Sequence, residues 1–137
     1  MFTHDHQIRI RYSETDQMGY CYYGNYAAFF EIGRVETLRA LGISYKSLEQ
    51  SGIMLPVTEF YVKYLKPAVY DDLITIRTKL IKTPSVKIEF EYELFNDKGQ
   101  LLTEAKTTLV FIQSENMKPC PAPKDLLNKL KEKIEIS

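Results

Sequence analysis

Residues 24–41 read GNYAAFFEIGRVETLRAL, and this stretch decides how the rest of the chain is organised. Placed at 100° per residue, its apolar side chains cover nearly the whole circumference of a helix. A helix of this kind is normally buried, so we expect a central helix over 24–41. Asn25 is placed to cap its start, and Gly42 is placed to end it. Four charged residues interrupt the helix and need partners or an exit to water: Glu31, Arg34, Glu36 and Arg39.

After the helix, the apolar period changes from helical spacing to alternation. Residues 86–95 read VKIEFEYELF, where apolar and charged side chains alternate almost without a break. This pattern predicts a strand with one face on a core and the other in water, as in antiparallel sheets. Similar patterns predict strands at 7–12, 55–65, 73–81 and 101–112, tight turns at 82–85 and 96–99, and further helices at 44–50 and 124–134.

The expected order is therefore a strand, the central helix, four antiparallel strands and a terminal helix. An antiparallel sheet of about five strands, wrapped around the central helix, satisfies both the apolar helix and the one-sided strands. This α+β arrangement is the hotdog fold. The chain length of 137 residues suits a single domain of this type, 1–137.

The overall composition excludes several classes of protein. Eighteen basic residues balance eighteen acidic ones, which leaves no overall field for nucleic acid or an anionic membrane. No apolar run approaches the roughly 20 residues of a membrane-spanning helix, and the N-terminus does not resemble a signal peptide. The two cysteines, Cys21 and Cys120, cannot form a disulfide framework and suit a reducing compartment. We therefore expect a cytoplasmic protein with no nucleic-acid partner and no membrane insertion.

The segment at 12–26, YSETDQMGYCYYGNY, resembles the signature of the 4-hydroxybenzoyl-CoA thioesterase family. The resemblance continues through FEIGR at 30–34 and YLKPA at 64–68, and covers nearly the whole chain in the right order. It implies a hotdog-fold enzyme that hydrolyses an acyl-CoA thioester. The chain departs from one branch of the family, the bacterial proteins associated with the Tol–Pal envelope system, because Tyr23 stands where those relatives often carry histidine.

Asp16 is the expected catalytic carboxylate, as general base or as nucleophile. The leaving thiolate has a solution pKa of about 8.5 and needs no strong general acid. What remains is attack on the carbonyl and stabilisation of the oxyanion. The start of the central helix, near Tyr23 and Gly24, has free N–H groups and the positive end of the helix dipole for the second task. Gly24 has no Cβ that would keep a substrate at a distance.

Two further residues are secondary catalytic candidates. Tyr12 matches a position proposed to assist the aspartate in some relatives, although a core tyrosine is the simpler interpretation. Glu31 is the rival acid, because another branch of hotdog thioesterases carries its carboxylate on the central helix. With Arg34 one turn later, a buried ion pair is the better interpretation of Glu31.

Two other groups of residues invite functional interpretations that we do not favour. Cys21 lies in the active-site loop, but the chain has only His4 and His6 as partners for a Cys–His nucleophile. The segment His4-Asp5-His6 lacks a third firm metal ligand, so we expect a frayed terminus there. No metal and no redox cofactor is expected.

The resemblance also implies where the substrate binds. Lys82 and Lys87 flank a turn at which relatives contact the CoA nucleotide, sometimes across a subunit boundary, and solvated lysines at strand ends are the alternative. Ser85 matches a recurrent serine of the family, and Asn25 is the remaining substrate-binding candidate. Two alternative functions stay open: an acyl-carrier-protein thioesterase, and a non-hydrolytic acyl-binding or interaction module. We expect a homodimer or homotetramer, because a lone hotdog sheet leaves its edges exposed.

Overall fold

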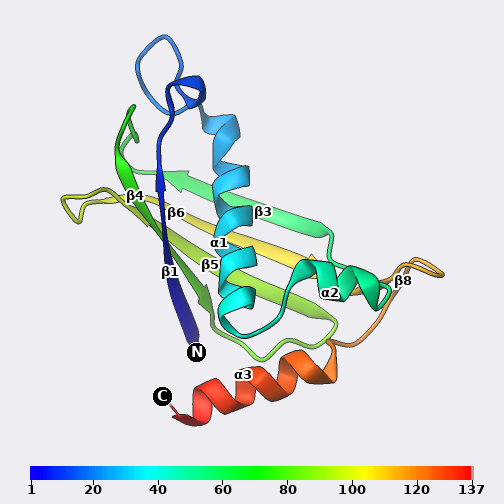
Figure 1. Cartoon of the computed structure of the whole chain (residues 1–137). Coiled ribbons are helices and arrows are strands. Elements are labelled where there is room, and N and C mark those ends of the chain that lie inside the picture. Colours follow the sequence, from blue (N-terminus) through cyan, green and yellow to red (C-terminus); the bar gives the residue numbers. More distant parts are fainter. Residues whose placement is uncertain (137) are drawn as a thin grey trace.

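The computed structural model describes residues 1–136 and has the predicted architecture, a five-stranded antiparallel sheet around one long helix (Figure 1). The sheet has the strand order β1-β4-β5-β6-β3. Its strands are β1 (Phe2–Arg9), β3 (Val57–Tyr64), β4 (Leu73–Leu80), β5 (Lys87–Phe95) and β6 (Leu101–Val110). The helices are η1 (Tyr12–Glu14) and η2 (Tyr23–Asn25), both 3₁₀, then α1 (Tyr26–Ala40), α2 (Tyr45–Gln50) and α3 (Lys124–Ile136). A second small sheet joins β2 (Ile53–Met54), β7 (Ile112–Gln113) and β8 (Lys118–Pro119).

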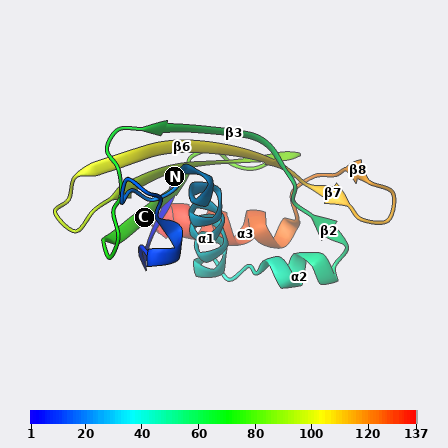
Figure 2. The same ribbon diagram turned by 90° about the horizontal axis from the view of Figure 1, so that it is seen from above.

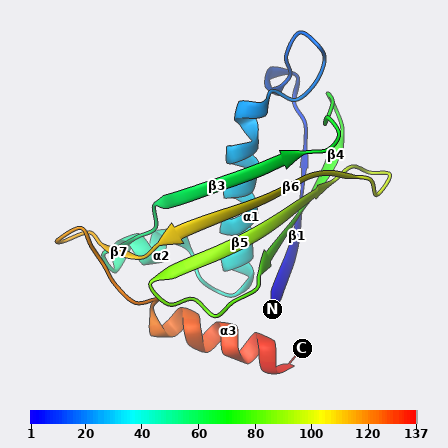
Figure 3. The ribbon, with the colours of Figure 1, turned by 180° about the vertical axis from the view of Figure 1, so that it is seen from behind.

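The concave face of the sheet packs against α1, as the views from above and from behind show (Figures 2 and 3). The alternation at 86–95 has the predicted consequence, since the even-numbered side chains of β5 are buried against the helix. Phe30 of α1 is fully buried, with its ring centroid 4.7 Å from that of Tyr92 and 5.9 Å from that of Phe60. Burying each such side chain stabilises the fold by roughly 1.5–3 kcal/mol.

Gly33 allows α1 to lie close to β4. A Cβ at this position would stand 2.6 Å from Thr78 Oγ1 and 2.8 Å from Ile76 Cγ2, closer than any normal contact. Thr78 is completely buried, and its hydroxyl has no hydrogen-bond partner within the described residues. Gly33 therefore stands in the middle of the helix because the short distance between α1 and β4 leaves no room for a Cβ atom.

The prediction that α1 is buried all round was wrong for this single chain. The sheet covers one side of the helix, and six residues of α1 are exposed: Ala27, Ala28, Glu31, Ile32, Arg39 and Ala40. The expected ion pair between Glu31 and Arg34 is also missing from the described part of the chain. Arg34 points into the protein instead, where its Nε donates to the Tyr45 hydroxyl at 3.1 Å. The two charges diverge because Arg34 faces the core and Glu31 faces solvent.

The first strand begins earlier than predicted and ends before Tyr12. Residues 2–9 form β1 and pair with β4 along their whole length, so the expected frayed terminus was wrong. Asp5 helps to hold the strand, since its carboxylate accepts two hydrogen bonds from Arg77 at 3.0 and 3.1 Å. His4 and His6 lie on the opposite face of the strand from Asp5, and residues 1–136 contain no cluster of three or more potential metal ligands.

The remaining predictions of secondary structure are close to the observed bounds. Ser44 caps α2, with its hydroxyl accepting the Ser47 N–H at 3.0 Å. Gly42 ends α1 with a φ of +87°. The strand predicted at 101–112 is interrupted at Phe111, and Ile112 belongs to β7 of the small sheet. None of the helices within residues 1–136 is both long and apolar enough for a membrane span.

Candidate active site

The loop that joins β1 to α1 lies at the end of the molecule where α1 begins (Figure 1). Asp16 belongs to a tight turn of this loop, after η1. Its Oδ1 atom accepts the backbone N–H groups of Met18 at 2.9 Å and Tyr20 at 3.3 Å. Gly19, with a φ of +79°, closes the turn by donating to the Asp16 carbonyl at 3.0 Å. The Oδ2 atom makes no hydrogen bond within the described residues. One oxygen therefore orients the carboxylate, and the other is available to water or substrate.

The base of this turn is tied to the start of the central helix. The Glu14 carbonyl accepts two hydrogen bonds of 2.8 Å, one from the Tyr22 N–H and one from the Asn25 side-chain amide. The Cys21 N–H donates to the Ala68 carbonyl at 2.7 Å, which attaches the same loop to the segment after β3. The loop that carries Asp16 and the first turns before α1 thus form one hydrogen-bonded unit.

A cavity of about 290 Å³ opens beside Asp16. Besides the carboxylate, its wall includes four tyrosines, a cysteine and a lysine: Tyr20, Tyr23, Tyr26, Tyr64, Cys21 and Lys66. The Tyr64 hydroxyl donates to the Tyr23 carbonyl at 3.4 Å, which braces η2 against β3. The volume is roughly twice that of an engineered cavity of about 150 Å³ that binds benzene, so a small acyl group fits.

Free hydrogen-bond donors lie at the start of the helical segment. In residues 1–136 the backbone N–H groups of Tyr23 and Gly24 meet no acceptor. They precede α1, whose dipole adds positive potential at this end. Gly24 has a structural reason as well, because a Cβ there would stand 2.6 Å from the ring of Tyr22. Tyr23 lines the cavity beside Asp16, whereas Gly24 follows it in η2 and is not part of the cavity wall. A carboxylate and unpaired N–H donors are the pair of groups that acyl transfer requires.

Cys21 is unsuited to nucleophilic attack. Its side chain is buried, and burial together with the neighbouring Glu14 carboxylate raises the pKa of the thiol to about 11. A reactive cysteine needs a lowered pKa and a base beside it. The thiol at this position is protonated at neutral pH and acts as part of the cavity wall.

The two secondary catalytic candidates lie outside this cavity. Tyr12 is 78% exposed and packs edge-on against Tyr70, with the ring centroids 5.6 Å apart, so the simple core interpretation was wrong. Its strand ends at Arg9, and the following 3₁₀ turn carries Tyr12 away from the core. Glu31 is on the solvent side of α1 and does not line the cavity.

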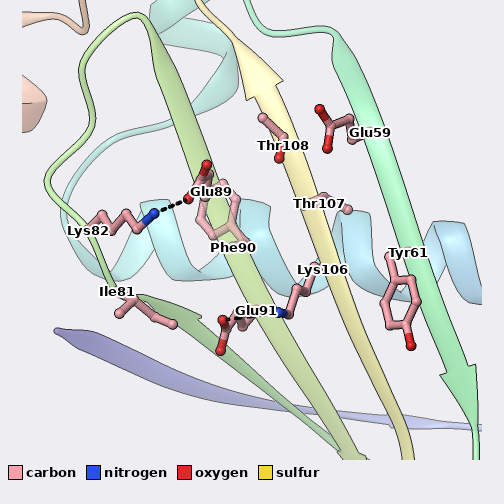
Figure 4. Close-up of a pocket in the computed structure, with 10 residues that line it drawn as sticks. All are labelled: Glu59, Tyr61, Ile81, Lys82, Glu89, Phe90, Glu91, Lys106, Thr107 and Thr108. Atoms are coloured by element: carbon pink, nitrogen blue, oxygen red, sulfur yellow. Dashed lines mark ion pairs between the residues drawn. The ribbon is translucent and has the colours of Figure 1, made fainter.

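The expected CoA-binding residues lie elsewhere on the chain. Lys82 lines a separate cavity of about 320 Å³ on the outer face of the sheet, where it forms an ion pair with Glu89 at 3.3 Å (Figure 4). Lys87 is exposed at the start of β5. Ser85 shapes the turn through its backbone, which donates to the Lys87 carbonyl at 3.1 Å and accepts from the Ala122 N–H at 2.7 Å. Within one chain, none of the three lines the cavity beside Asp16.

The sequence did not predict most of the cavity wall, including Tyr26, Tyr64 and Lys66, as site residues. For Tyr26 the sequence predicts only a place at the start of the apolar helix, and its buried position raises the pKa of its phenol to about 12. Tyr64 and Lys66 belong to the segment YLKPA, which resembles a family passage but gave no position in space. Tyr64 packs edge-on against Tyr26, with the ring centroids 5.0 Å apart. The pairing of β3 with β6 and the backbone bond from Cys21 to Ala68 place this segment opposite the start of α1.

Comparison with known proteins shows which family this chain is similar to. The model of the thioesterase-like superfamily matches residues 10–130. The acyl-CoA thioester hydrolase YbgC of Escherichia coli O6:H1 is 30% identical over 125 residues, which are 91% of this chain and 93% of that protein. The 1,4-dihydroxy-2-naphthoyl-CoA hydrolase of Thermosynechococcus vestitus is 25% identical over 123 residues, with coverage of 89% and 84%. The crystal structure of a DHNA-CoA thioesterase from Staphylococcus aureus superposes with a TM-score of 0.92 at 34% identity, and the match covers 99% of this chain and 93% of that one.

Proposed function

Since the chain belongs to the thioesterase-like superfamily and is a hotdog-fold thioester hydrolase, we propose that it hydrolyses acyl-CoA to a free acid and CoA at Asp16. The observation that carries the proposal is the shared cavity, which is lined both by the Asp16 carboxylate and by Tyr23 of the donor-rich helix start. Relatives named as acyl-CoA thioesterases and hydrolases support the substrate class.

The chemistry requires two actions at the thioester carbonyl. Asp16 either removes a proton from the attacking water or attacks through Oδ2 to give a mixed anhydride that water then hydrolyses. In both cases the carbonyl electrons move onto oxygen, and the N–H groups of Tyr23 and Gly24 donate to that oxyanion. Collapse of the tetrahedral intermediate expels CoA thiolate, which needs little assistance because thiols are acidic, as the reference pKa of about 8.5 for cysteine illustrates.

The substrate's phosphates need cations at the mouth of the site, and Lys82, Ser85 and Lys87 remain our candidates. In one chain they lie away from the cavity beside Asp16, so this role requires contact across a subunit boundary. A second copy has an available docking edge, because β3 is the last strand of the sheet and nearly all of it is exposed. Phe60 and Tyr61 present apolar surface there, and Tyr64 at the end of the strand lines the cavity. We therefore propose a homodimer through β3 at least, which sedimentation tests directly, and a stable monomer would contradict it.

The proposed location is the cytoplasm. Both cysteines of the chain, Cys21 and Cys120, are unpaired and buried, as suits a reducing compartment.

The deciding experiment is a panel of acyl-CoA substrates that vary in length and ring content, with thiol release followed by a colorimetric reagent. Turnover of at least one acyl-CoA, reduced roughly 10²- to 10⁴-fold in Asp16→Asn, is the expected result. Hydrolysis of acyl-carrier-protein thioesters alone would show that the substrate is an acyl-carrier-protein thioester and not an acyl-CoA. Saturable binding of acyl-CoA with no release of thiol would support the non-hydrolytic module instead.

A further inference from the structure

Asn25 stands where a helix cap is expected, but its side chain does not cap α1. Its φ of −79° and ψ of −17° are already helical, and the side chain accepts no hydrogen bond from the first turn. The amide instead donates to the Glu14 carbonyl at 2.8 Å, eleven residues earlier in the chain. The side chain therefore connects two segments of the chain and does not cap α1, which is preceded directly by η2.

The connection runs from the helix start toward the catalytic carboxylate. Glu14 lies two residues before Asp16, and its own carboxylate is held by the Arg11 N–H at 2.7 Å. The other donor to the Glu14 carbonyl is the Tyr22 N–H, directly before the unpaired donors of η2. The Asn25 amide is thus the side chain that links the turn carrying Asp16 to the segment with the unpaired N–H groups.

The distance across this link matters for acyl transfer. The attacking oxygen and the oxyanion donors must bracket one carbonyl group, and a displacement of about 1 Å can reduce the rate roughly 10²-fold. Without the Asn25 bond the backbone still holds the loop, through Tyr22 N–H to Glu14 and Cys21 N–H to Ala68, but the Glu14 carbonyl keeps one donor in place of two and the carboxylate turn gains freedom relative to η2. Removal of the Asn25 bond should therefore disturb the geometry of the site before it disturbs the fold.

We propose that Asn25 is a positioning residue that holds Asp16 in register with the N–H groups of Tyr23 and Gly24, acting through Glu14 and making no contact with the substrate. The inference rests on the proposed thioesterase function and replaces the expectation that Asn25 binds the substrate. The lining of the cavity beside Asp16 does not include Asn25, although its chain neighbour Tyr26 is part of it.

The substitution Asn25→Asp separates this role from helix stabilisation. Asp has the same size and is at least as favourable as Asn at the start of a helix. It has no N–H to donate, and it sets a carboxylate against the Glu14 carbonyl. Asn25→Ser is the uncharged companion, because serine also suits a helix start but is too short to reach Glu14. We expect kcat to fall 10- to 100-fold in both variants, with KM within threefold of the parent and a melting temperature within a few degrees.

Asn96→Asp is the matched control. The Asn96 amide donates to Gln100 Oε1 at 2.8 Å in the turn between β5 and β6, so the same chemical change removes an equivalent bond elsewhere. Its kinetic constants should equal those of the parent.

Three outcomes would overturn the inference without touching the proposed function. A rise in KM with unchanged kcat would show that Asn25 contacts the substrate. A fall in kcat that matches the fraction of unfolded protein would show a structural role only. Parental kinetics in both Asn25 variants, in a parent that depends on Asp16, would reject the positioning role and leave the proposed function intact. A parent that releases no thiol, or an Asp16→Asn variant with full activity, would reject the proposed function itself, and this inference with it.

Discussion

Asp16→Asn removes the basic oxygen of the site while leaving the turn that holds it. Asparagine keeps an Oδ1 acceptor for the Met18 and Tyr20 N–H groups, the two bonds that orient the side chain. A bond to a neutral acceptor contributes about 1 kcal/mol less than one to a charged acceptor, and partial exposure of Asp16 reduces this difference. We therefore expect the free energy of unfolding to fall by no more than about 1–2 kcal/mol.

The effect on chemistry should be several times larger. Loss of a positioned acid–base group reduces turnover roughly 10²- to 10⁴-fold. At about 1.36 kcal/mol per factor of ten, this raises the activation free energy by about 2.7–5.4 kcal/mol. Some activity should survive, because the N–H groups at the helix start still polarise the carbonyl.

The assay compares kcat and KM from thiol release with the melting temperature of each variant. Glu31→Gln is the control, because it neutralises an exposed carboxylate that lies outside the cavity. It should show parental turnover and a stability within about 0.5 kcal/mol of the parent. If Asp16→Asn keeps parental turnover while Glu31→Gln is inactive, the catalytic carboxylate lies on the helix and our assignment is wrong.

Three further predictions concern CoA binding, packing and pH. Replacing Lys82 and Lys87 together with Ala should raise KM for acyl-CoA and leave KM for a pantetheine thioester nearly unchanged, and equal losses on both substrates would exclude phosphate recognition. Gly33→Ala should lower the free energy of unfolding by about 1–3 kcal/mol in urea titration, because its Cβ would overlap a buried threonine hydroxyl on β4, whereas a gain would show that the helix can shift. The melting temperature should fall as pH rises above 9, because burial raises the pKa of Cys21 to about 11 and that of Tyr26 to about 12, so unfolding releases protons there. A flat profile between pH 9 and 11 would contradict this.

Much of the fold was predictable because it depends on local patterns. The alternation at 86–95 and the apolar helix at 24–41 each require the other, since a one-sided sheet and an apolar helix bury the same kind of surface. Turn positions followed from glycine, as the positive φ values of Gly42 and Gly99 confirm. The same alternation could have predicted that Lys87 is exposed on the outer face of the sheet, because it lies on the same strand face as the solvent-facing glutamates of β5.

The errors arose where a side chain's partner comes from another part of the chain. Spacing along a helix brings Glu31 and Arg34 to neighbouring positions, but in the packed structure Arg34 is buried and Glu31 is exposed. The alternation at 7–12 predicts Tyr12 as a buried strand residue, but the strand ends at Arg9 and the following 3₁₀ turn exposes Tyr12 to solvent.

By itself, the sequence determined the elements, their order, the family resemblance and the choice of Asp16, because composition, period and motif are properties of neighbouring residues. Only the tertiary structure decided what surrounds Asp16. The pairing of β3 with β6 sets Tyr64 against Tyr26, and the Glu14 carbonyl receives the Asn25 amide across eleven residues. These contacts join residues that are distant in the sequence. Which distant segments meet depends on tertiary packing, and the spacing of residues along the chain does not specify it.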